Sequence, residues 1–391
     1  MNTERPVWAE VSLSAIRNNM AAIQTAITPR TPGGKKPIFC PVIKANGYGH
    51  GAVVMGQEAV RAGAEYVAVA LLQEALELRE AGISLPILAL NYTPENAAEE
   101  LVGNTITQTV YEKCHLDALS SAAQSTGKTA NVHVKIDTGM TRIGIRPKDA
   151  PEFCRYADSL PGIHLEGVYT HLATADGTTT GELAYAEKQF TLFQQALTAI
   201  RACGIHPTIT HCANSAATLF LPHTHLDMVR PGIILYGLPP AQSLPLPPEF
   251  VPPLSLKARI SMLKTVPTGT SVSYGATITT TRETLVATIP LGYADGYTRM
   301  LSNRVSASIH GQRIHGIGRI CMDQCMFDAT DATIPTSSTP NSPTRPVHKD
   351  DIVTLFGPHD VRADDLAAIL NTINYEILCM VGSRVKRVYV E

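Results

Sequence analysis

The sequence predicts an α/β protein with two domains: an N-terminal (β/α)8 barrel of the TIM type and a mostly-β C-terminal domain. The chain has 391 residues, which exceeds one ordinary hydrophobic core, and 44% of them are hydrophobic. Up to about residue 230, short apolar segments alternate with helical ones, as in a closed parallel barrel. Beyond Gly237 the chain becomes proline-rich and then continues as short strands. We therefore expect one domain at residues 1–240 and another at 241–391.

Eight short segments rich in β-branched residues are the expected barrel strands. A further strand at 7–11 and a helix to about residue 27 precede them. The eight expected strands cover residues 38–44, 66–70, 86–91, 105–110, 131–137, 163–170, 207–211 and 227–230. The expected helices between them cover residues 73–81, 94–102, 111–125, 150–160 and 182–203.

Composition excludes several classes of function. The formal net charge is −2, and no run of like charges marks a surface for nucleic acid. No segment has the length of a membrane span and the N-terminus lacks a signal-peptide core, so we expect a cytoplasmic protein with neither nucleic acid nor membrane as a partner. The eight cysteines include no C-x-x-C pair, so neither a disulfide framework nor a metal site is expected.

Polar residues gather where the expected strands end. Barrel enzymes carry their chemistry at the carboxyl ends of the strands, because the loops there meet at one rim. Residues of this kind follow the first, fifth, sixth, seventh and eighth strands: Lys44, Asp137, Arg142, His171, His211, Asn214, Ser215 and Arg230. A single histidine is usually a packed or surface residue, but the common rim favours a catalytic site.

Lys44 is the most informative of these residues. It ends an apolar strand, where desolvation favours the neutral amine that can form a Schiff base with an aldehyde. Ser215 opens a helix, and Gly232 lets backbone amides approach a ligand, so the last two loops suit a phosphate. An aldehyde-reactive lysine beside a phosphate site points to pyridoxal 5′-phosphate. The alternatives are a lysine that merely reaches solvent and a plain Pro-Gly turn.

The expected strands of the second domain are interrupted by turns that place tyrosines beside glycines. Tyr274 and Tyr293 lie in such turns, which are typical of a binding surface, although tyrosine is also common on sheet faces. The expected strands cover residues 256–266, 272–277, 283–290, 304–309, 313–320, 324–328 and 351–356, followed by a helix at 364–370 and a strand that ends at Glu391. We expect residues 331–350 to form an exposed loop without chemistry.

Six motifs support a resemblance that covers almost the whole chain. They read VIKANGYGHG at 42–51, KIDTGMTRIG at 135–144, RPGIILYG at 230–237, VSYG at 272–275, LGYADGY at 291–297 and CMDQ at 321–324. In this order they resemble the motifs of the alanine racemase family, fold-type III enzymes that use pyridoxal 5′-phosphate. The resemblance implies an enzyme that interconverts L-alanine and D-alanine and supplies D-alanine for peptidoglycan.

The resemblance also implies roles for single residues. Lys44 would hold the cofactor covalently, Arg142 would contact its phenolic oxygen, and Arg230 would face its ring nitrogen. The other residues implied around the cofactor are Tyr48, Ser215, Gly232 and Ile233 at the phosphate, His171 and His211 beside Arg230, and Asn214. A permanently charged Arg230 disfavours protonation of the ring nitrogen, which suits racemisation and suppresses transamination.

Inversion of a stereocentre needs an acid/base group on each face of the substrate. The resemblance implies Lys44 for the α-proton of D-alanine, and Tyr274 of the other subunit for that of L-alanine. A homodimer is therefore implied, because one subunit alone would not own both bases. The residues implied to line the substrate site are Arg142 and, from the same partner chain as Tyr274, Tyr293, Met322 and Asp323.

Two positions leave alternatives open. Lys135 matches a lysine that is often carbamylated in the family and then positions Arg142, but an unmodified lysine is the simpler alternative. Ser383 stands where many relatives have a tyrosine that touches the phosphate and crowds the substrate side chain. The smaller hydroxyl implies a side activity on serine.

Two other functions are kept as alternatives. An amino-acid decarboxylase of the same architecture would need an acidic group at the ring nitrogen, where Arg230 stands. A non-catalytic carrier of pyridoxal 5′-phosphate would keep Lys44 and the phosphate loops but would not need Tyr274 or a β domain. The sequence does not separate a biosynthetic role from a catabolic one.

Overall fold

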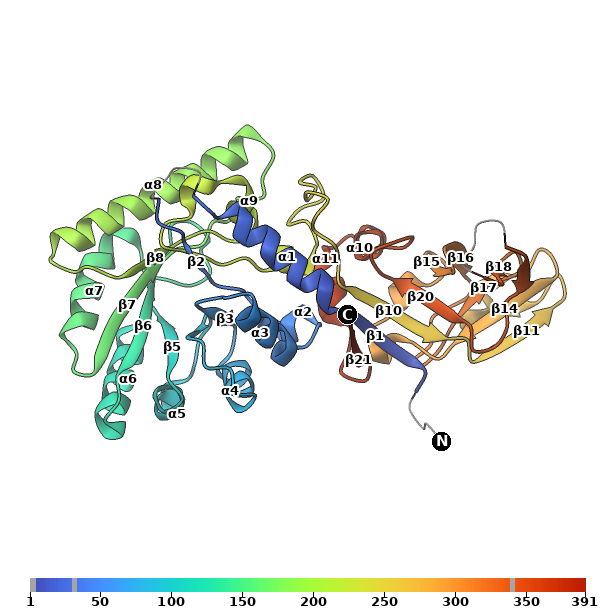
Figure 1. Ribbon diagram of the computed structural model, residues 1–391, viewed down its shortest axis with the longest axis horizontal. Helices are drawn as coiled ribbons and strands as arrows, with labels where there is room; N and C mark the ends of the chain where they lie inside the picture. The colour runs from blue at the N-terminus through green and yellow to red at the C-terminus, as the bar shows by residue number, and fades with distance from the viewer. Residues whose placement is uncertain (1–4, 30–33, 338–341) are drawn as a thin grey trace. The chain divides into compact units, whose positions relative to one another are not determined.

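The computed structural model describes residues 5–29, 34–337 and 342–391 (Figure 1). The chain forms two compact units, one of Ile16–Phe250 and one that combines Met1–Ala15 with Val251–Glu391. The expected boundary near residue 240 lies close to the observed change of unit. The expected start of the first domain at residue 1 differs, because the first fifteen residues belong with the C-terminal strands.

The first unit is built on an eight-stranded sheet in the order β2-β9-β8-β7-β6-β5-β4-β3. Every pair in this sheet is parallel. Val42, just after β2, forms a parallel bridge to Ala68 in β3, so the two ends of the sheet meet and the barrel closes. All eight expected strands are confirmed. Their bounds are β2 (Ile38–Phe39), β3 (Val67–Val69), β4 (Ile87–Ala89), β5 (Ile106–Val110), β6 (Ala130–Lys135), β7 (Ile163–Tyr169), β8 (Ile209–His211) and β9 (Met228–Val229).

Helices follow the strands, as the alternating pattern predicts. The expected helices correspond to α1 (Leu13–Ala26), α4 (Leu72–Glu80), α5 (Ala98–Gly103), α6 (Lys113–Thr126), α7 (Ala150–Ser159) and α8 (Thr180–Ala202), and Ser215 does open α9 (Ser215–Phe220). The sequence analysis missed α3 (Ala52–Arg61), which begins after Gly51 without a side-chain cap. Helix α8 has the start signal that α3 lacks, because Thr179 and Glu182 form a reciprocal capping box.

The second unit is built on a nine-stranded sheet in the order β11-β14-β17-β16-β15-β20-β10-β1-β21. Strand β1 (Val7–Ser12) lies between β10, its antiparallel neighbour, and β21, its parallel neighbour. Its residues alternate between buried and half-buried, which suits a sheet with one covered face. The other strands are β10 (Leu254–Arg259), β11 (Met262–Val266), β14 (Thr284–Ile289), β15 (Ser306–Ile309), β16 (Gln312–Gly316), β17 (Cys325–Asp328), β20 (Ile352–Phe356) and β21 (Lys386–Val390).

Three expectations for this unit need correction. The single strand expected at 256–266 is two strands, β10 and β11, interrupted at Ile260 and Ser261. The loop expected at 331–350 contains a strand pair, β18 (Thr333–Pro335) and β19 (Thr344–Pro346), while its residues 338–341 lie outside the described part. The single strand expected at 272–277 is a turn that carries Tyr274, flanked by a small pair, β12 (Ser271–Val272) and β13 (Ile278–Thr279). The expected helix is confirmed as α10 (Ala363–Leu370), and a second one, α11 (Asn374–Met380), follows it.

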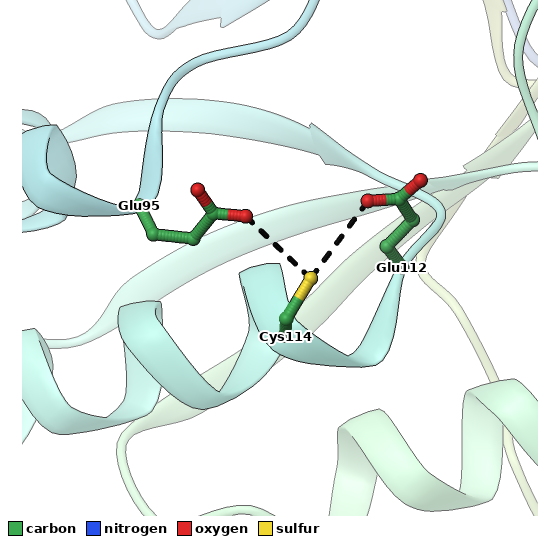
Figure 2. A group of neighbouring side chains, drawn as sticks. All are labelled: Glu95, Glu112 and Cys114. Carbon is green, nitrogen blue, oxygen red and sulfur yellow. Dashed lines mark hydrogen bonds between the residues drawn. The ribbon is translucent and has the colours of Figure 1, made fainter.

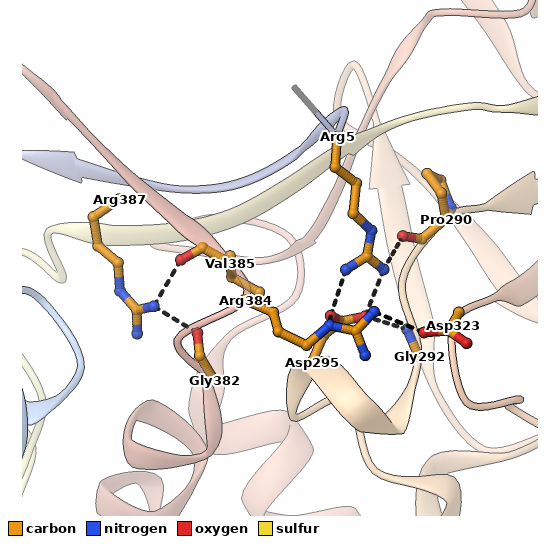
Figure 3. Close-up of polar contacts among 9 residues, drawn as sticks. All are labelled: Arg5, Pro290, Gly292, Asp295, Asp323, Gly382, Arg384, Val385 and Arg387. Atoms are coloured by element: carbon orange, nitrogen blue, oxygen red, sulfur yellow. Dashed lines mark hydrogen bonds and ion pairs between the residues drawn. The ribbon is translucent and has the colours of Figure 1, made fainter. Parts of the chain in front are cut away.

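A buried carboxylate joins both ends of the chain to the centre of this unit (Figure 3). The Asp295 side chain is inaccessible to solvent and accepts hydrogen bonds of 2.5 and 2.7 Å from the Arg5 guanidinium. It also accepts one from the Gly292 amide at 3.0 Å, and Nε of Arg384 lies 3.5 Å away. Burial alone would raise the pKa of Asp295, but the Arg5 and Gly292 hydrogen bonds outweigh it and lower the pKa.

Replacement of Asp295 tests this junction. The variant Asp295→Asn leaves Arg5 without its buried partner, so we expect a loss of about 3 kcal/mol in the free energy of unfolding at neutral pH. Because the pKa of Asp295 is lowered by folding, its contribution exists above the unfolded pKa of about 3.9 and disappears as the pH falls through the folded pKa. Denaturant unfolding of both proteins at neutral and acidic pH measures the difference.

The matched control is Asp331→Asn, which removes an ion pair of the same kind with Arg282 at the surface. The Asp331 side chain is 76% exposed, so this change has a much smaller effect. Equal destabilisation by the two substitutions, or a difference for Asp295→Asn that persists in acid, contradicts the role assigned to Asp295.

Candidate active site

Lys44 begins a strained turn at the carboxyl end of the first barrel strand. The next three residues have left-handed backbone angles, with φ of 52° at Ala45, 53° at Asn46 and 59° at Gly47. For residues with a side chain such angles cost about 1–2 kcal/mol each, and they persist only where the surroundings impose them. The Ala45 amide donates to Glu74 at 2.6 Å, and the Asn46 side chain accepts from the Ala52 amide at 2.9 Å. The turn holds Lys44 half-buried.

Two hydroxyl groups and a backbone amide meet where this turn approaches the last two loops of the barrel. The Gly232 amide donates to Oγ of Ser215 at 2.8 Å. A Cβ atom at Gly232 would lie 2.7 Å from the Tyr48 hydroxyl, so only glycine leaves room at this point. The Tyr48 ring stacks on Tyr236 with centroids 4.7 Å apart. Hydroxyl and amide donors of this kind suit a phosphate group.

The remaining residues expected at this cradle flank it in the chain. Asn214 caps helix α9, because its side chain accepts from the Ala217 amide at 3.1 Å. Ile233 begins the short 3-10 helix that follows Gly232, η4 (Ile233–Tyr236). The structure therefore brings Tyr48, Ser215 and Gly232 together and places Asn214 and Ile233 next to them in sequence.

Arg230 is buried just past the end of β9 (Met228–Val229), and within the described residues the acceptors of its guanidinium hydrogen bonds are all neutral groups. It donates to Nδ1 of His211, to the Thr170 carbonyl at 3.0 Å and, at 3.4 Å, to Nδ1 of His171. Because a guanidinium is always a donor, Nδ1 of His211 must accept, which places the His211 proton on Nε2. Burial, and secondarily the charge of Arg230, lower the pKa of His171 and His211 well below the usual range.

The hydrogen-bond direction that Arg230 imposes on His211 extends to further side chains in the barrel interior. Nε2 of His211 is 2.9 Å from Nδ1 of His133, whose own Nε2 lies 3.2 Å from Glu166. Burial lowers the pKa of His133. Both imidazoles are therefore neutral, and their N–H bonds all point from Arg230 toward the Glu166 carboxylate. Tyr66 also donates to Glu166, at 2.7 Å.

Lys135 and Arg142 occupy contrasting environments. Lys135 is buried, and burial together with the charge of Arg230 lowers the pKa of its amine to about 7. Its Nζ lies over the Tyr169 ring, 5.1 Å from the centroid, and donates to the Ile136 carbonyl at 3.2 Å. Arg142 is exposed in the loop that Asp137 organises by accepting two backbone amides, from Gly139 and Thr141.

The sequence analysis missed three of the buried partners: His133, Glu166 and Tyr169. Tyr169 stacks on His211 with centroids 4.6 Å apart and planes 3° apart. His133 and Glu166 point into the barrel from the middle of β6 and β7, not from the strand ends on which the search was based. An inward-facing histidine opposite a glutamate on the next strand is the signal that could have found them.

The residues expected from the C-terminal unit lie on one surface of that unit. The Tyr274 side chain is 68% exposed, on a turn in which Ser273 has φ of 66° and Gly275 has φ of 74°. Tyr293 and Met322 are also exposed, and the Tyr293 and Ala294 amides donate to the Cys321 and Met322 carbonyls.

Polar contacts hold the neighbouring residues of that surface. Asp323 accepts from Arg384 at 2.8 Å (Figure 3), and Ser383, next to Arg384, is exposed. Oγ of Ser273 donates to the Arg319 carbonyl at 2.7 Å, which ties the Tyr274 turn to the segment that carries Met322 and Asp323.

Comparisons with known proteins agree with this arrangement. The chain matches the family models for the alanine racemase N-terminal domain, over residues 11–240, and C-terminal domain, over residues 253–389. It is 53% identical to an alanine racemase of Desulfovibrio desulfuricans, with 99% of both chains covered. Among solved structures, it is similar to alanine racemase of Clostridium difficile 630, with a TM-score of 0.90, 39% identity, and 100% of this chain and 97% of that chain covered.

Another solved structure, from Bacillus anthracis with bound L-Ala-P, has a TM-score of 0.87 and 35% identity, with 100% of this chain and 96% of that chain covered. In the part of the chain that the structure describes, no helix has the length and apolarity needed to span a bilayer. With both family models matched and the barrel and β unit formed as they require, the chain belongs to the alanine racemase family, whose members are isomerases that act on amino acids.

Proposed function

We propose that this protein is a pyridoxal 5′-phosphate-dependent racemase that interconverts L-alanine and D-alanine. The observation that carries the proposal is the convergence at one barrel rim of Lys44, the Tyr48–Ser215–Gly232 cradle and the buried Arg230. The relatives named as alanine racemases, over the full length of the chain, support the choice of substrate.

The residues at the rim fit the cofactor by their chemistry. The cradle offers two hydroxyls and an amide to a phosphate, in a space that a Cβ at Gly232 would fill. The Lys44 amine would hold the aldehyde carbon, and Arg142 the phenolic oxygen. When bound, pyridoxal 5′-phosphate supplies the electron-withdrawing system that acidifies the α-proton of the amino acid.

Arg230 would determine which reaction follows removal of that proton. Its guanidinium would face the ring nitrogen, and a permanent positive charge there disfavours the addition of a proton to that nitrogen. His211 accepts a hydrogen bond from Arg230 through Nδ1. While His211 stays in this neutral tautomer it takes no proton from Arg230, so Arg230 keeps its positive charge. A decarboxylase would need an acidic residue at this position, whereas the chain has the permanently charged Arg230, so racemisation is favoured over decarboxylation.

Two groups would move the α-proton. Nζ of Lys44 would remove it from D-alanine, and the Tyr274 hydroxyl of the other subunit would remove it from L-alanine. In each direction, the group on the opposite face would supply the proton that is added. The 68% exposure of Tyr274 on a strained turn supports its presentation to a second chain in a head-to-tail homodimer. Tyr293, Met322 and Asp323 would line the substrate site from that same surface, with Arg142 from the barrel.

We also propose a cytoplasmic location and a biosynthetic role, the supply of D-alanine for peptidoglycan. All eight cysteines are free thiols, which is typical of proteins in a reducing compartment. Deletion of the gene separates this role from a catabolic one. A host cell that then requires added D-alanine supports the biosynthetic role, and one that does not supports the catabolic role.

Deuterium incorporation tests both the reaction and the two bases. In D2O the holoenzyme should convert each alanine enantiomer into the other with deuterium at Cα and without release of carbon dioxide. We expect Tyr274→Phe to lower kcat by about 10²–10⁴-fold, because L-alanine loses its base, while D-alanine still exchanges its α-proton at Lys44. Lys44→Ala should lose the cofactor's visible absorbance and all exchange.

The control for removal of a phenol is Tyr156→Phe, on helix α7, which should racemise at the parental rate. Carbon dioxide release would favour the decarboxylase, and cofactor absorbance without any turnover would favour the carrier protein. Interconversion by Tyr274→Phe at the parental rate would exclude the two-base mechanism while leaving racemisation itself intact.

We propose that Lys135 carries a carbamate that positions Arg142. The neutral amine attacks carbon dioxide, an N–C bond forms and one proton is released; a pKa of about 7 makes the neutral form available near neutral pH. With ¹³C-bicarbonate, we expect a protein carbamate signal that grows as the pH is raised through about 7. Lys128→Ala, at an exposed lysine, should keep this signal and Lys135→Ala should lose it. A carbamate signal that is unchanged in Lys135→Ala would not come from Lys135, and would support the unmodified lysine.

We propose a side activity on serine, because the exposed Ser383 hydroxyl stands where many relatives carry a phenol. The variant Ser383→Tyr should lower kcat/KM for L-serine by roughly tenfold, since the ring occupies space that the larger substrate needs. The value for L-alanine, measured on the same variant, should change much less. Unaltered serine turnover in Ser383→Tyr would remove this proposal.

A further inference from the structure

A cluster of three possible ligands lies outside the loops that build the rim described above. Glu95 begins the short 3-10 helix η1 (Glu95–Ala97) after β4, and Glu112 and Cys114 lie at the start of α6 after β5. Figure 2 shows the two carboxylates turned toward the Cys114 sulfur. Sγ lies 3.5 Å from Oε1 of Glu95 and 3.7 Å from Oε2 of Glu112, and one ligand atom from each residue lies within 4.8 Å of the others.

His115 gives an independent indication of a ligand. It is 3% exposed, yet within the described part of the chain neither of its ring nitrogens makes a hydrogen bond. A buried polar group left in this state costs about 1–3 kcal/mol. Nε2 of His115 lies 3.6 Å from Oε1 of Glu95, the same oxygen that Cys114 contacts. The ring stacks on Tyr92, which itself donates to the other Glu95 oxygen at 3.1 Å.

The distances match the coordination shell of a small cation. Bonds of about 2.3 Å to sulfur and about 2.0–2.2 Å to nitrogen or oxygen give tetrahedral ligand–ligand edges of about 3.3–3.6 Å. Three of the six edges among the four ligand atoms, Cys114–Glu95, Cys114–Glu112 and His115–Glu95, are 3.5, 3.7 and 3.6 Å. Glu95, Glu112 and Cys114 are close enough to share one metal ion after small side-chain rotations, and Nε2 of the buried His115 approaches this group from the side of Glu95.

The donor set selects the class of metal. Thiolate and imidazole ligands favour borderline-soft transition metals such as Zn²⁺ over Mg²⁺ or Ca²⁺. The nearby cation on α6 does not neutralise the carboxylates, because Lys113 pairs with Glu152 at 3.2 Å. Without metal, the Cys114 sulfur lies as a thiol beside the carboxylates of Glu95 and Glu112.

We propose that Glu95, Glu112, Cys114 and His115 form a tetrahedral site for one Zn²⁺ ion per chain. Binding replaces the Cys114 thiol proton, which is released to solvent, and gives Nε2 of the buried His115 imidazole a partner. The site would fasten η1 to the start of α6. It uses none of the residues proposed for racemisation, so it stands or falls separately from the proposed function.

Co²⁺ is the spectroscopic probe for this site. The full-length holoenzyme, freed of metals by a chelator, should bind one Co²⁺ per chain with a thiolate-to-cobalt charge-transfer band, and Zn²⁺ should displace it. Cys114→Ser should lose the band, and Glu112→Gln should weaken binding by about tenfold or more. Cys203→Ser removes another exposed thiol and is the matched control, in which the band should remain.

His115→Phe tests the fourth ligand and keeps an aromatic ring against Tyr92. Weaker Co²⁺ binding by a folded His115→Phe supports the site, and if this variant does not fold, Glu95→Gln gives the same test at an exposed position. Absence of the band in the parental protein, or an equal band in Cys114→Ser, overturns the proposal. Racemisation measured on the same samples reports separately on the active site.

Discussion

The buried guanidinium of Arg230 is the constraint on which the interior of the barrel depends. A cation deprived of water must be compensated, and a partner carboxylate in direct contact would cancel the charge that the reaction is proposed to need. The barrel instead compensates it at a distance, through His211 and His133, whose N–H bonds point toward Glu166. The positive charge at the rim is therefore preserved while its hydrogen bonds are satisfied.

This arrangement explains why histidines stand where barrels usually have aliphatic layers. Each imidazole must be neutral, with one nitrogen that accepts and one that donates, and burial lowers the pKa of both rings. Tyr169 adds a flat surface that fixes the His211 ring, and its hydroxyl bonds to Thr109 at 2.9 Å. After burial, the charge of Arg230 is the second cause that lowers the pKa of Lys135, to about 7, so one buried charge affects several groups.

Much of the fold follows from the sequence because its signals are local. The β-branched runs gave all eight barrel strands, and Lys44, His211 and Arg230 could be placed at strand ends from their positions in those runs alone. The capping box at Thr179 marks helix α8, whereas α3 begins after Gly51 with no such signal and was missed. Local sequence patterns therefore predict single helices and strands.

What could not be predicted depends on pairings across long sequence separations. The link from His133 to Glu166 joins two strands, and the contact of Glu95 with Cys114 joins the helices η1 and α6, so neither has a local motif. The glycines that follow Lys44 do not by themselves determine the left-handed turn, because Ala45 and Asn46 adopt the same strained angles.

The position of β1 has a consequence for how the chain is made. Its two neighbours, β10 and β21, begin at Leu254 and Lys386, so the N-terminal strand emerges from the ribosome long before either of them exists. The barrel, which ends by Phe250, can close during synthesis, whereas the sheet that contains β1 is completed only once β21 has been made. Until β10 is made, β1 has two unpaired edges, and a chain that lacks β21 would leave one of them permanently open.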